Sequence, residues 1–409
     1  MPEPKHSPLQ RLKKAAIPAD PALRVLSLAT LINTFGNGLF MTIEVLYFTL
    51  HVGLSAASVA LGLGVAGGVS MLFSVPAGHL ADRYGPRDIA SFAYIMEGLL
   101  LIGFIFVNSF MPFLILSVLI GAIGAVGQTL RMATIASFGV GEERVRIRAY
   151  TRAVTNLGIA MGTVLAGIAL AVNTNTSYNT MLIIDATTYI VTAFVWRRLP
   201  YVAPTVSKGE PFSFVALKDK KFMGATFLNG VMSLHFVLQN VAIPLWVVNE
   251  TNAPRWWIAV ILLVNTVAVI LFQVRASRGA GDIQNGARKF ERAGFYVAIS
   301  CILYALSAGV STIAACILLV AAMGVHVAGE LVGSVGSWSI GFGMADPKYQ
   351  GQYQGAYSLG WGIGGTFGPT IVTALAITMG RVGWLILAGI FIVTGMLMRR
   401  LVSTSEQRS

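Results

Sequence analysis

The sequence predicts an all-α integral membrane protein: twelve transmembrane helices in two pseudo-symmetric six-helix halves, with both termini in the cytoplasm. Three observations predict it, namely an apolar composition, twelve long apolar stretches and a weak repeat near half the chain length. Of the 409 residues, 55% are hydrophobic and only 11% are charged, and the mean hydropathy is +0.72. An ordinary soluble domain carries about 25% charged residues, so we expect most of the chain to lie in lipid.

Stretches of about twenty apolar residues are long enough to cross, as helices, a bilayer core of about 30 Å. Several stretches here are longer and rich in glycine, so we expect tilted or bent helices. The polar, basic residues 1–22 lead straight into the first stretch without the pattern of a cleavable signal peptide. The candidate spans are residues 23–50, 54–78, 89–107, 111–137, 149–172, 179–197, 221–248, 256–275, 293–309, 311–340, 352–378 and 382–400.

The basic residues predict the orientation of these spans. With the N-terminus in the cytoplasm, all but three of the 29 lysines and arginines lie in cytoplasmic segments, the exceptions being Arg131, Arg255 and Arg381. This asymmetry predicts that both ends of the chain are cytoplasmic. The net charge of +12 then follows from topology and from contact with anionic membrane lipid, and we expect no nucleic-acid partner.

Two short patterns recur at close to half the chain length, which favours two related halves. Residues 198–220 contain prolines and basic residues but no run long enough to span, as expected of a linker. We therefore divide the chain into a cytoplasmic N-terminal arm (1–22), a six-helix half (23–197), a cytoplasmic linker (198–220), a second six-helix half (221–400) and a cytoplasmic tail (401–409). The recurring residues are Gly78, Gly85 and Arg87 with Gly279, Gly286 and Arg288, and Leu157, Gly158 and Gly162 with Leu359, Gly360 and Gly364.

A charged cluster, GHLADRYGPRD at residues 78–88, joins the second and third spans. Gly78 allows close approach of another helix, and Gly85 permits the tight turn between two antiparallel helices. Asp82 can accept hydrogen bonds from Arg83 or Arg87, or lie at the N-terminus of another helix. A plain solvated loop that obeys the positive-inside rule is the alternative.

Gly78, Asp82, Arg83, Gly85 and Arg87 resemble the G-x-x-x-D-R-x-G-x-R signature of the major facilitator superfamily. The resemblance covers essentially the whole chain. The segments NLGIAMGTVLAG, MLIIDATTYIVTA and YQGQYQGAYSLGWGIGGTFGPT resemble bacterial drug-efflux members, including the macrolide-efflux-like group. It implies that the 78–88 loop latches the two halves in one facing state. It also implies a multi-pass protein of the bacterial cytoplasmic (inner) membrane, which we expect to work as a monomer.

The sequence departs from the family pattern at a few positions of this loop and its repeat. Pro86 and Asp88 stand where basic residues are frequent, and the second copy has Ile283 in place of Asp82. We therefore expect no equivalent latch on the side of the second copy.

The fifth span carries part of a glycine-rich pattern of family antiporters, through Gly158, Gly162 and Gly167. The pattern's proline is missing, so export and simple close packing of helices both account for these glycines. Gly368 and Pro369 predict a bend or hinge in the eleventh span.

Ionisable residues inside the spans are the first candidates for chemistry, because each is costly to hold in an apolar setting. They are Glu44, Glu97, Arg131, Asp185 and Glu330, with Arg152 near the cytoplasmic end of the fifth span. Family geometry implies that spans one, four, seven and ten line the cavity and that spans three, six, nine and twelve lie outside. Glu44, Arg131 and Glu330 are thus expected at the cavity, and Glu97 and Asp185 in peripheral, structural places.

Glu44 is the first candidate for a proton carrier, since an apolar setting favours its protonated form at neutral pH. Its alternative is a structural carboxyl paired with a polar neighbour. Glu330 has His326 one turn earlier on the same helix face, and the two form either a proton relay or a hydrogen-bonded lock between helices. Asp185 is a weaker proton-coupling candidate.

A substrate cavity is predicted from polar and aromatic residues of the cavity spans. Arg131 needs a partner because it stays charged, and both a cavity anion site and a structural salt bridge are open to it. Its neighbour on the helix face is Gln128. The further cavity candidates are Asn37, His235, Gln239, Asn240 and Trp361.

Other chemistries find no pattern in the sequence. It has no P-loop, no HExxH, no CxxC and no nucleophile elbow, so we expect no enzyme, no ATP-driven pump, no cofactor and no metal. What remains is secondary transport driven by the proton gradient through a midplane cavity. The predicted function is export of small hydrophobic or cationic molecules such as drugs, with membrane lipid as the surrounding partner; the alternative is a proton-coupled symporter that imports a small nutrient.

Overall fold

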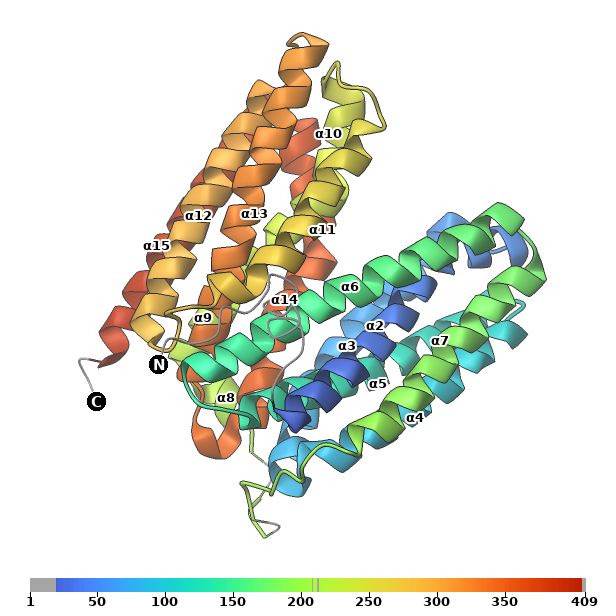
Figure 1. Ribbon diagram of the computed structural model, residues 1–409, viewed down its shortest axis with the longest axis vertical. Helices are drawn as coiled ribbons and strands as arrows, with labels where there is room; N and C mark the ends of the chain where they lie inside the picture. Colours follow the sequence, from blue (N-terminus) through green and yellow to red (C-terminus); the bar gives the residue numbers. More distant parts are fainter. Residues whose placement is uncertain (1–19, 208, 212, 407–409) are drawn as a thin grey trace, which may run out of the picture.

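A computed structural model describes residues 20–207, 209–211 and 213–406, and this part of the chain is helical throughout apart from its loops. It contains ten helices long and apolar enough to cross a membrane. The helices form two groups that meet at one end of the molecule and diverge from there (Figure 1). Residues 1–19 of the predicted N-terminal arm and residues 407–409 of the predicted tail lie outside the described residues.

The first group holds the helices before the linker. Helix α2 packs against α6 and α7, α3 packs against α5, and α4 lies against both α5 and α7. One continuous cluster of buried apolar side chains joins these helices. The elements are α2 (Pro21–Leu46), η1 (Tyr47–His51), α3 (Ala56–Tyr84), α4 (Pro86–Gly103), η2 (Phe104–Phe106), α5 (Phe110–Ser137), α6 (Glu142–Val172) and α7 (Asn175–Trp196).

The second group has its own apolar cluster, built around α12 against α13 and α15. Two of its long segments, α12 and α14 with η5, fall outside the ten membrane candidates. The elements are α8 (Val215–Lys218), α9 (Lys220–Val237), η3 (Leu238–Ala242), α10 (Ile243–Glu250), α11 (Trp257–Ala276), α12 (Ile283–Leu306), α13 (Thr312–Gly343), η4 (Pro347–Tyr349), α14 (Gln350–Thr373), η5 (Ala374–Thr378) and α15 (Gly380–Glu406).

Glycines set the closest helix contacts within each group. A side chain on Gly158 would meet the Thr34 hydroxyl of α2, and one on Gly162 would meet the backbone of α2. Their sequence counterparts on α14 meet α9 in the same way, while no atom lies within 4 Å of a side chain placed on Gly167. Gly368 packs against the Val237 side chain of α9. Close packing thus accounts for the recurring pair of glycines in both groups.

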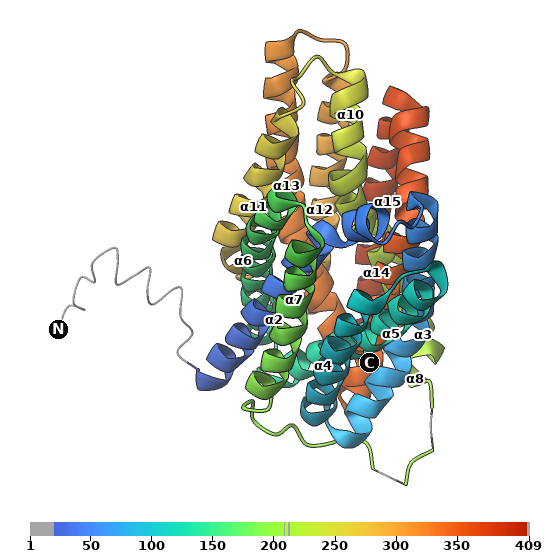
Figure 2. The same ribbon diagram turned by 90° about the vertical axis from the view of Figure 1, so that its right-hand side faces the viewer.

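Two seams join the groups. In the first seam α3 packs against α14, and in the second seam α6 packs against α11 and α13. The linker passes across this same end of the molecule from α7 to α8 (Figure 2). Gly85 lies between α3 and α4 with φ of 83°, a left-handed conformation that glycine tolerates, and makes the tight turn expected there.

Candidate functional site

Three adjoining cavities lie among the helices around the seams. The first, of about 370 Å³, is lined by α2, α4, α5, α6 and α7. The second, of about 460 Å³, lies between α6 and the helices α9, α11 and α13 with η3. The third, of about 370 Å³, lies between α3, α5 and α14. The first cavity shares Arg152 and Ile159 with the second, and Gly124 and Gln128 with the third. Together they have the size of a site for a small organic molecule.

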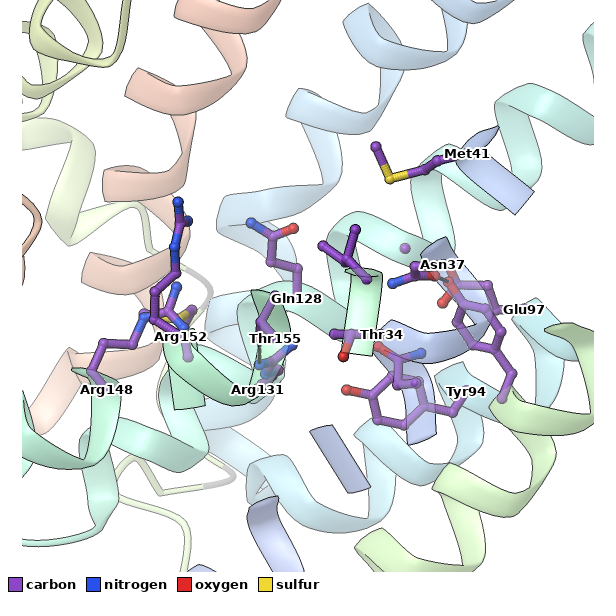
Figure 3. A pocket seen from close by; sticks show the side chains of 15 residues that line it. Thr34, Asn37, Met41, Tyr94, Glu97, Gln128, Arg131, Arg148, Arg152 and Thr155 are labelled. Atoms are coloured by element: carbon purple, nitrogen blue, oxygen red, sulfur yellow. Dashed lines mark hydrogen bonds between the residues drawn. The ribbon is translucent and has the colours of Figure 1, made fainter. Parts of the chain in front are cut away.

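Three predicted cavity residues, Asn37, Gln128 and Arg131, line the first cavity (Figure 3). Nη2 of Arg131 donates to Oγ1 of Thr155 at 3.1 Å. In the described part of the chain no carboxylate lies within 4.0 Å of the Arg131 guanidinium. The structural salt bridge considered for Arg131 is therefore not formed here.

Glu97 lines this cavity as well, although it belongs to the third long helix, which the family geometry places outside. The reason lies on the neighbouring helix α5. A side chain placed on Gly124 would come within 3.0 Å of Oε1 of Glu97, so the glycine opens the path by which the carboxyl reaches the cavity. Tyr189 of α7 lines the same wall and donates to Oδ1 of Asn37 at 2.7 Å.

Glu330 lies at the second cavity, where it bridges the two groups. Nη2 of Arg152, from α6, lies 3.2 Å from Oε1 of Glu330, from α13. Nδ2 of Asn265 donates to Oε2 at 2.7 Å and also lies 3.0 Å from Oε1 of Gln239. The Glu330 side chain is 2% exposed and that of Arg152 is 22% exposed. Such a buried pair is sensitive to the loss of either charge.

In the described part of the chain, the hydrogen-bond partners of His326 are residues other than Glu330. Its Nε2 lies 3.3 Å from Nδ1 of His235, and its Nδ1 lies 3.4 Å from Oγ of Ser300. Both histidines are buried, so His235 faces His326 rather than a cavity. A proton relay and a hydrogen-bonded lock were both open for His326, and this arrangement has the form of the lock. It connects α9 and α12 to α13.

Glu44 and Asp185 belong to the first group and line none of the three cavities. Glu44 is half-buried on α2. Asp185 is 1% exposed and packs against α2, where a side chain on Gly36 would meet Oδ1 of Asp185. Oγ1 of Thr188 lies 3.4 Å from that same carboxylate oxygen.

The other predicted cavity residues fall around the second and third cavities. Gln239 and Asn240 line the second, and Trp361 lines the third. The Trp361 ring lies 4.8 Å, centroid to centroid, from the ring of Phe236, which lines the second cavity. The two rings form an aromatic wall between the cavities.

The 78–88 loop closes the first seam. Oδ1 of Asp82 accepts from the backbone N–H of Gly351 at 2.6 Å, and Oδ2 accepts from that of Gln352 at 2.9 Å. These N–H groups belong to the first turn of α14. Of the partners considered for Asp82, the structure therefore shows the N-terminus of another helix. Arg87 instead pairs with Asp88 at 3.1 Å, and the Arg83 guanidinium lies 5.8 Å from the Tyr84 ring centre.

The second seam also has a carboxylate on a backbone N–H, where the sequence suggested no latch. Oε1 of Glu142, at the start of α6, accepts from the N–H of Gly279 at 2.8 Å. This carboxylate comes from the first group. The repeated loop of the second group, with Ile283 in place of Asp82, therefore could not indicate it.

Comparison with known proteins places this geometry among transporters. A family model described as Major Facilitator Superfamily matches residues 26–369. No curated protein matches the sequence at a significant level.

Three similar solved structures cover nearly the whole chain. A bacterial homologue of the iron transporter ferroportin in an outward-facing state has TM-score 0.74 at 11% identity, covering 95% of this chain and 100% of its own. The human organic anion transporter MFSD10 (TETRAN) has TM-score 0.70 at 14% identity, covering 93% and 100%. The proton:xylose symporter XylE has TM-score 0.68 at 13% identity, covering 92% and 94%. At these identities the likeness establishes the fold alone.

Proposed function

Because the chain belongs to the major facilitator superfamily, we propose that it is a proton-coupled secondary transporter that exports small hydrophobic or cationic molecules. Membership of this family of transporters, which are not enzymes, makes the chain a multi-pass membrane protein that transports small molecules by alternating access. Direction, coupling ion and cargo are the proposed part.

The proposal includes twelve spans. Besides the ten apolar helices, α12 has 24 residues and α14 has 24, and at about 1.5 Å per residue each is long enough to cross the bilayer core. Six spans then precede the linker and six follow it. From the positive-inside rule we infer that the basic linker end and both termini lie in the cytoplasm. The proposed membrane is the inner membrane of a bacterium.

The ion pair of Arg152 with Glu330 is the observation that carries the proposal. It joins α6 to α13 across the second cavity at 3.2 Å. A proton on Glu330 removes one of the two charges and leaves Arg152 without its partner, which disfavours the joined arrangement. Proton binding and release at Glu330 would therefore shift the balance between the two facing states. Glu44 is kept as a second proton carrier.

The arrangement of the seams supports a state closed at the linker end. Asp82 on the N-terminus of α14 and Glu142 on Gly279 hold that end together, whereas the two groups diverge toward the other end (Figure 1). With the linker in the cytoplasm, this is an outward-facing state. The loop 78–88 then acts as the latch that the family resemblance implies.

A second candidate, a proton-coupled symporter that imports a small nutrient, is favoured by one observation. The first cavity is polar and charged, with Arg131, Arg148, Arg152 and Glu97 on its walls. Such a wall suits a polar cargo held in one orientation better than a hydrophobic one.

Proton movement in everted membrane vesicles tests the proposal. With an imposed pH gradient, lipophilic cations and neutral antibiotics are added in turn to wild type, Glu330→Gln, Glu44→Gln and the control Glu143→Gln, whose carboxyl is exposed on α6. We expect a transported compound to collapse the gradient in wild type and control but not in Glu330→Gln. If no compound moves protons while labelled nutrients accumulate in whole cells, export is wrong and the importing symporter replaces it.

A further inference from the structure

The first cavity holds an excess of positive charge. Three arginines line it, Arg131 from α5 and Arg148 and Arg152 from α6, against the single carboxylate of Glu97 among the described lining residues. Arg148 lies within electrostatic range of both other arginines. In Figure 3, Arg148 and Arg152 lie on one side of the cavity and Glu97 on the other, with Arg131 between them. Glu97 is thus poorly placed to neutralise the α6 arginines.

Two of the three arginines have no carboxylate partner. Arg152 pairs with Glu330, but in the described part of the chain no carboxylate lies within 4.0 Å of Arg131 or Arg148. Arg148 lies over the Trp338 ring of α13, whose centre is 5.3 Å from the guanidinium carbon. The Nε atoms of all three arginines are buried without a hydrogen-bond partner.

This arrangement is costly unless an anion enters it. Guanidinium groups do not lose their charge in proteins, and like charges held together in a buried site repel one another. Buried donors without acceptors add a desolvation cost. An oxyanion offers the two parallel acceptors that match a guanidinium, and it would remove both costs at once.

We propose that the cargo is an organic anion whose acidic group is bound by Arg131 and Arg148, with Arg152 as the third cation. The inference rests on the proposed function only in taking this cavity as the transport site, and it replaces the hydrophobic or cationic cargo named there. Apolar surface for the body of such an anion comes from Met41 and Ile159 in the first cavity and from the Phe236 ring in the second.

An anion here also has a consequence for coupling. An acidic group that draws Arg152 toward itself leaves Glu330 as a buried charge without its partner, which is costly unless a cation is taken up together with the cargo. Anion and proton would then load together, which favours the second candidate, the symporter, over an exchange of cargo for protons.

The test is a charge series on one ring system, measured by calorimetric titration of the purified protein in lipid nanodiscs. The probes are 2-naphthoate, the neutral 2-naphthamide and the cationic 2-naphthylmethylammonium. We expect naphthoate to bind at least ~10-fold more tightly than either analogue, as hydrogen bonds between charged groups allow. Equal or tighter binding of the amide or the ammonium overturns the proposal, and so does no binding by any of the three.

Variants locate the site. Arg131→Gln and Arg148→Gln should each weaken naphthoate binding ~10-fold or more without changing amide binding, whereas Arg148→Lys should weaken it less, because lysine keeps the charge but loses the paired donors. Arg146→Gln is the matched control, since Arg146 lies on the same helix, exposed and facing Glu143 at 3.8 Å. Wild-type naphthoate binding in both glutamine variants overturns the proposal.

The two proposals fail separately. Binding needs no gradient, so naphthoate binding without proton movement in vesicles rejects proton coupling and keeps the anion site. Proton movement driven by the ammonium probe, with no preference for naphthoate, rejects the anion site and keeps proton-coupled export.

Discussion

The two seams that join the helix groups are built from different interactions. In the first, the backbones of α3 and α14 come together at Gly78 and Gly351, and Asp82 binds the first N–H groups of α14. In the second, arginines of α6 lie against α13, with Arg148 over Trp338 and Arg152 on Glu330. The arginines of the second seam also line the cavities. We infer that the first seam is a latch and that the second responds to proton and cargo.

The largest effect is expected where the second seam has its ion pair. Glu330→Gln or Arg152→Gln alone leaves one buried charge without a partner, which we expect to destabilise the joined state by about 2–4 kcal/mol, near the low end of measured losses because Arg152 is partly exposed. The double variant should lose clearly less than the sum of the two. A double-mutant cycle on the thermal midpoint of the purified protein measures this coupling.

Its control is the pair of Arg399 with Glu291, which joins α15 to α12 within the second group and has an arginine side chain that is 52% exposed. There the cycle should give about 0–1 kcal/mol. If both cycles give the same coupling, the second seam has no special electrostatic role and the contrast between the seams is lost.

An intermediate effect is expected at the first seam. Asp82→Asn keeps the shape of the side chain but removes its charge from the N-terminus of α14, which should cost about 0.5–2 kcal/mol of the closed state. A cysteine introduced at Ala136, which lines a cavity at the linker end, would then react with an impermeant thiol reagent about 2- to 30-fold faster.

Asp88→Asn is the matched control for Asp82→Asn. Asp88 is exposed and pairs with Arg87, so its loss should leave the labelling rate unchanged. Equal labelling rates in wild type and Asp82→Asn would mean that close backbone packing alone holds the first seam.

Much of this fold follows from one-dimensional patterns. Apolar runs predict the helices, and the glycine pair of the fifth span and its repeat each mark a close contact between helices. The start of α6 shows where an apolar pattern does not give the full length of a helix. The span was predicted over 149–172, but the helix begins at Glu142. The charged residues before 149 gave no apolar signal, yet they continue the same helix.

The site was less predictable, because it depends on which residues meet across helices. Arg131, Gln128 and Glu330 line cavities as expected, but Glu97 reaches the first cavity only because Gly124 lies opposite it. The spacing of His326 and Glu330 suggested a pair, whereas the fold gives His326 a partner on α9. Arg148 and Arg152 looked like positive-inside charges, and only the meeting of α5 with α6 reveals a cluster.

The smallest effect concerns a charged contact outside both seams. Nζ of Lys348 lies 2.9 Å from Oε1 of Glu210, and Oγ1 of Thr205 donates to the carbonyl of Lys348 at 2.7 Å, so the linker is tied to the loop before α14. The hydrogen bond from Lys348 lowers the pKa of Glu210 and raises the pKa of Lys348. A carboxyl with a lowered pKa contributes stability above its ordinary pKa and loses it as the pH falls through the lowered value.

A nitroxide label at Val202 would report this tie through its mobility. We expect mobility to rise as the pH falls below the ordinary range of glutamate, and Glu210→Gln to show the mobile spectrum already at pH 7 without further change on acidification. Because Lys348 is exposed and Glu210 is only half-buried, the pair is weak and transport should be unaffected. If the wild-type spectrum does not change with pH and matches that of Glu210→Gln, the ion pair does not hold the linker, and the hydrogen bonds of Thr205 and Val206 do. A loss of transport in Glu210→Gln would mean that the linker, too, belongs to the machinery that closes this end.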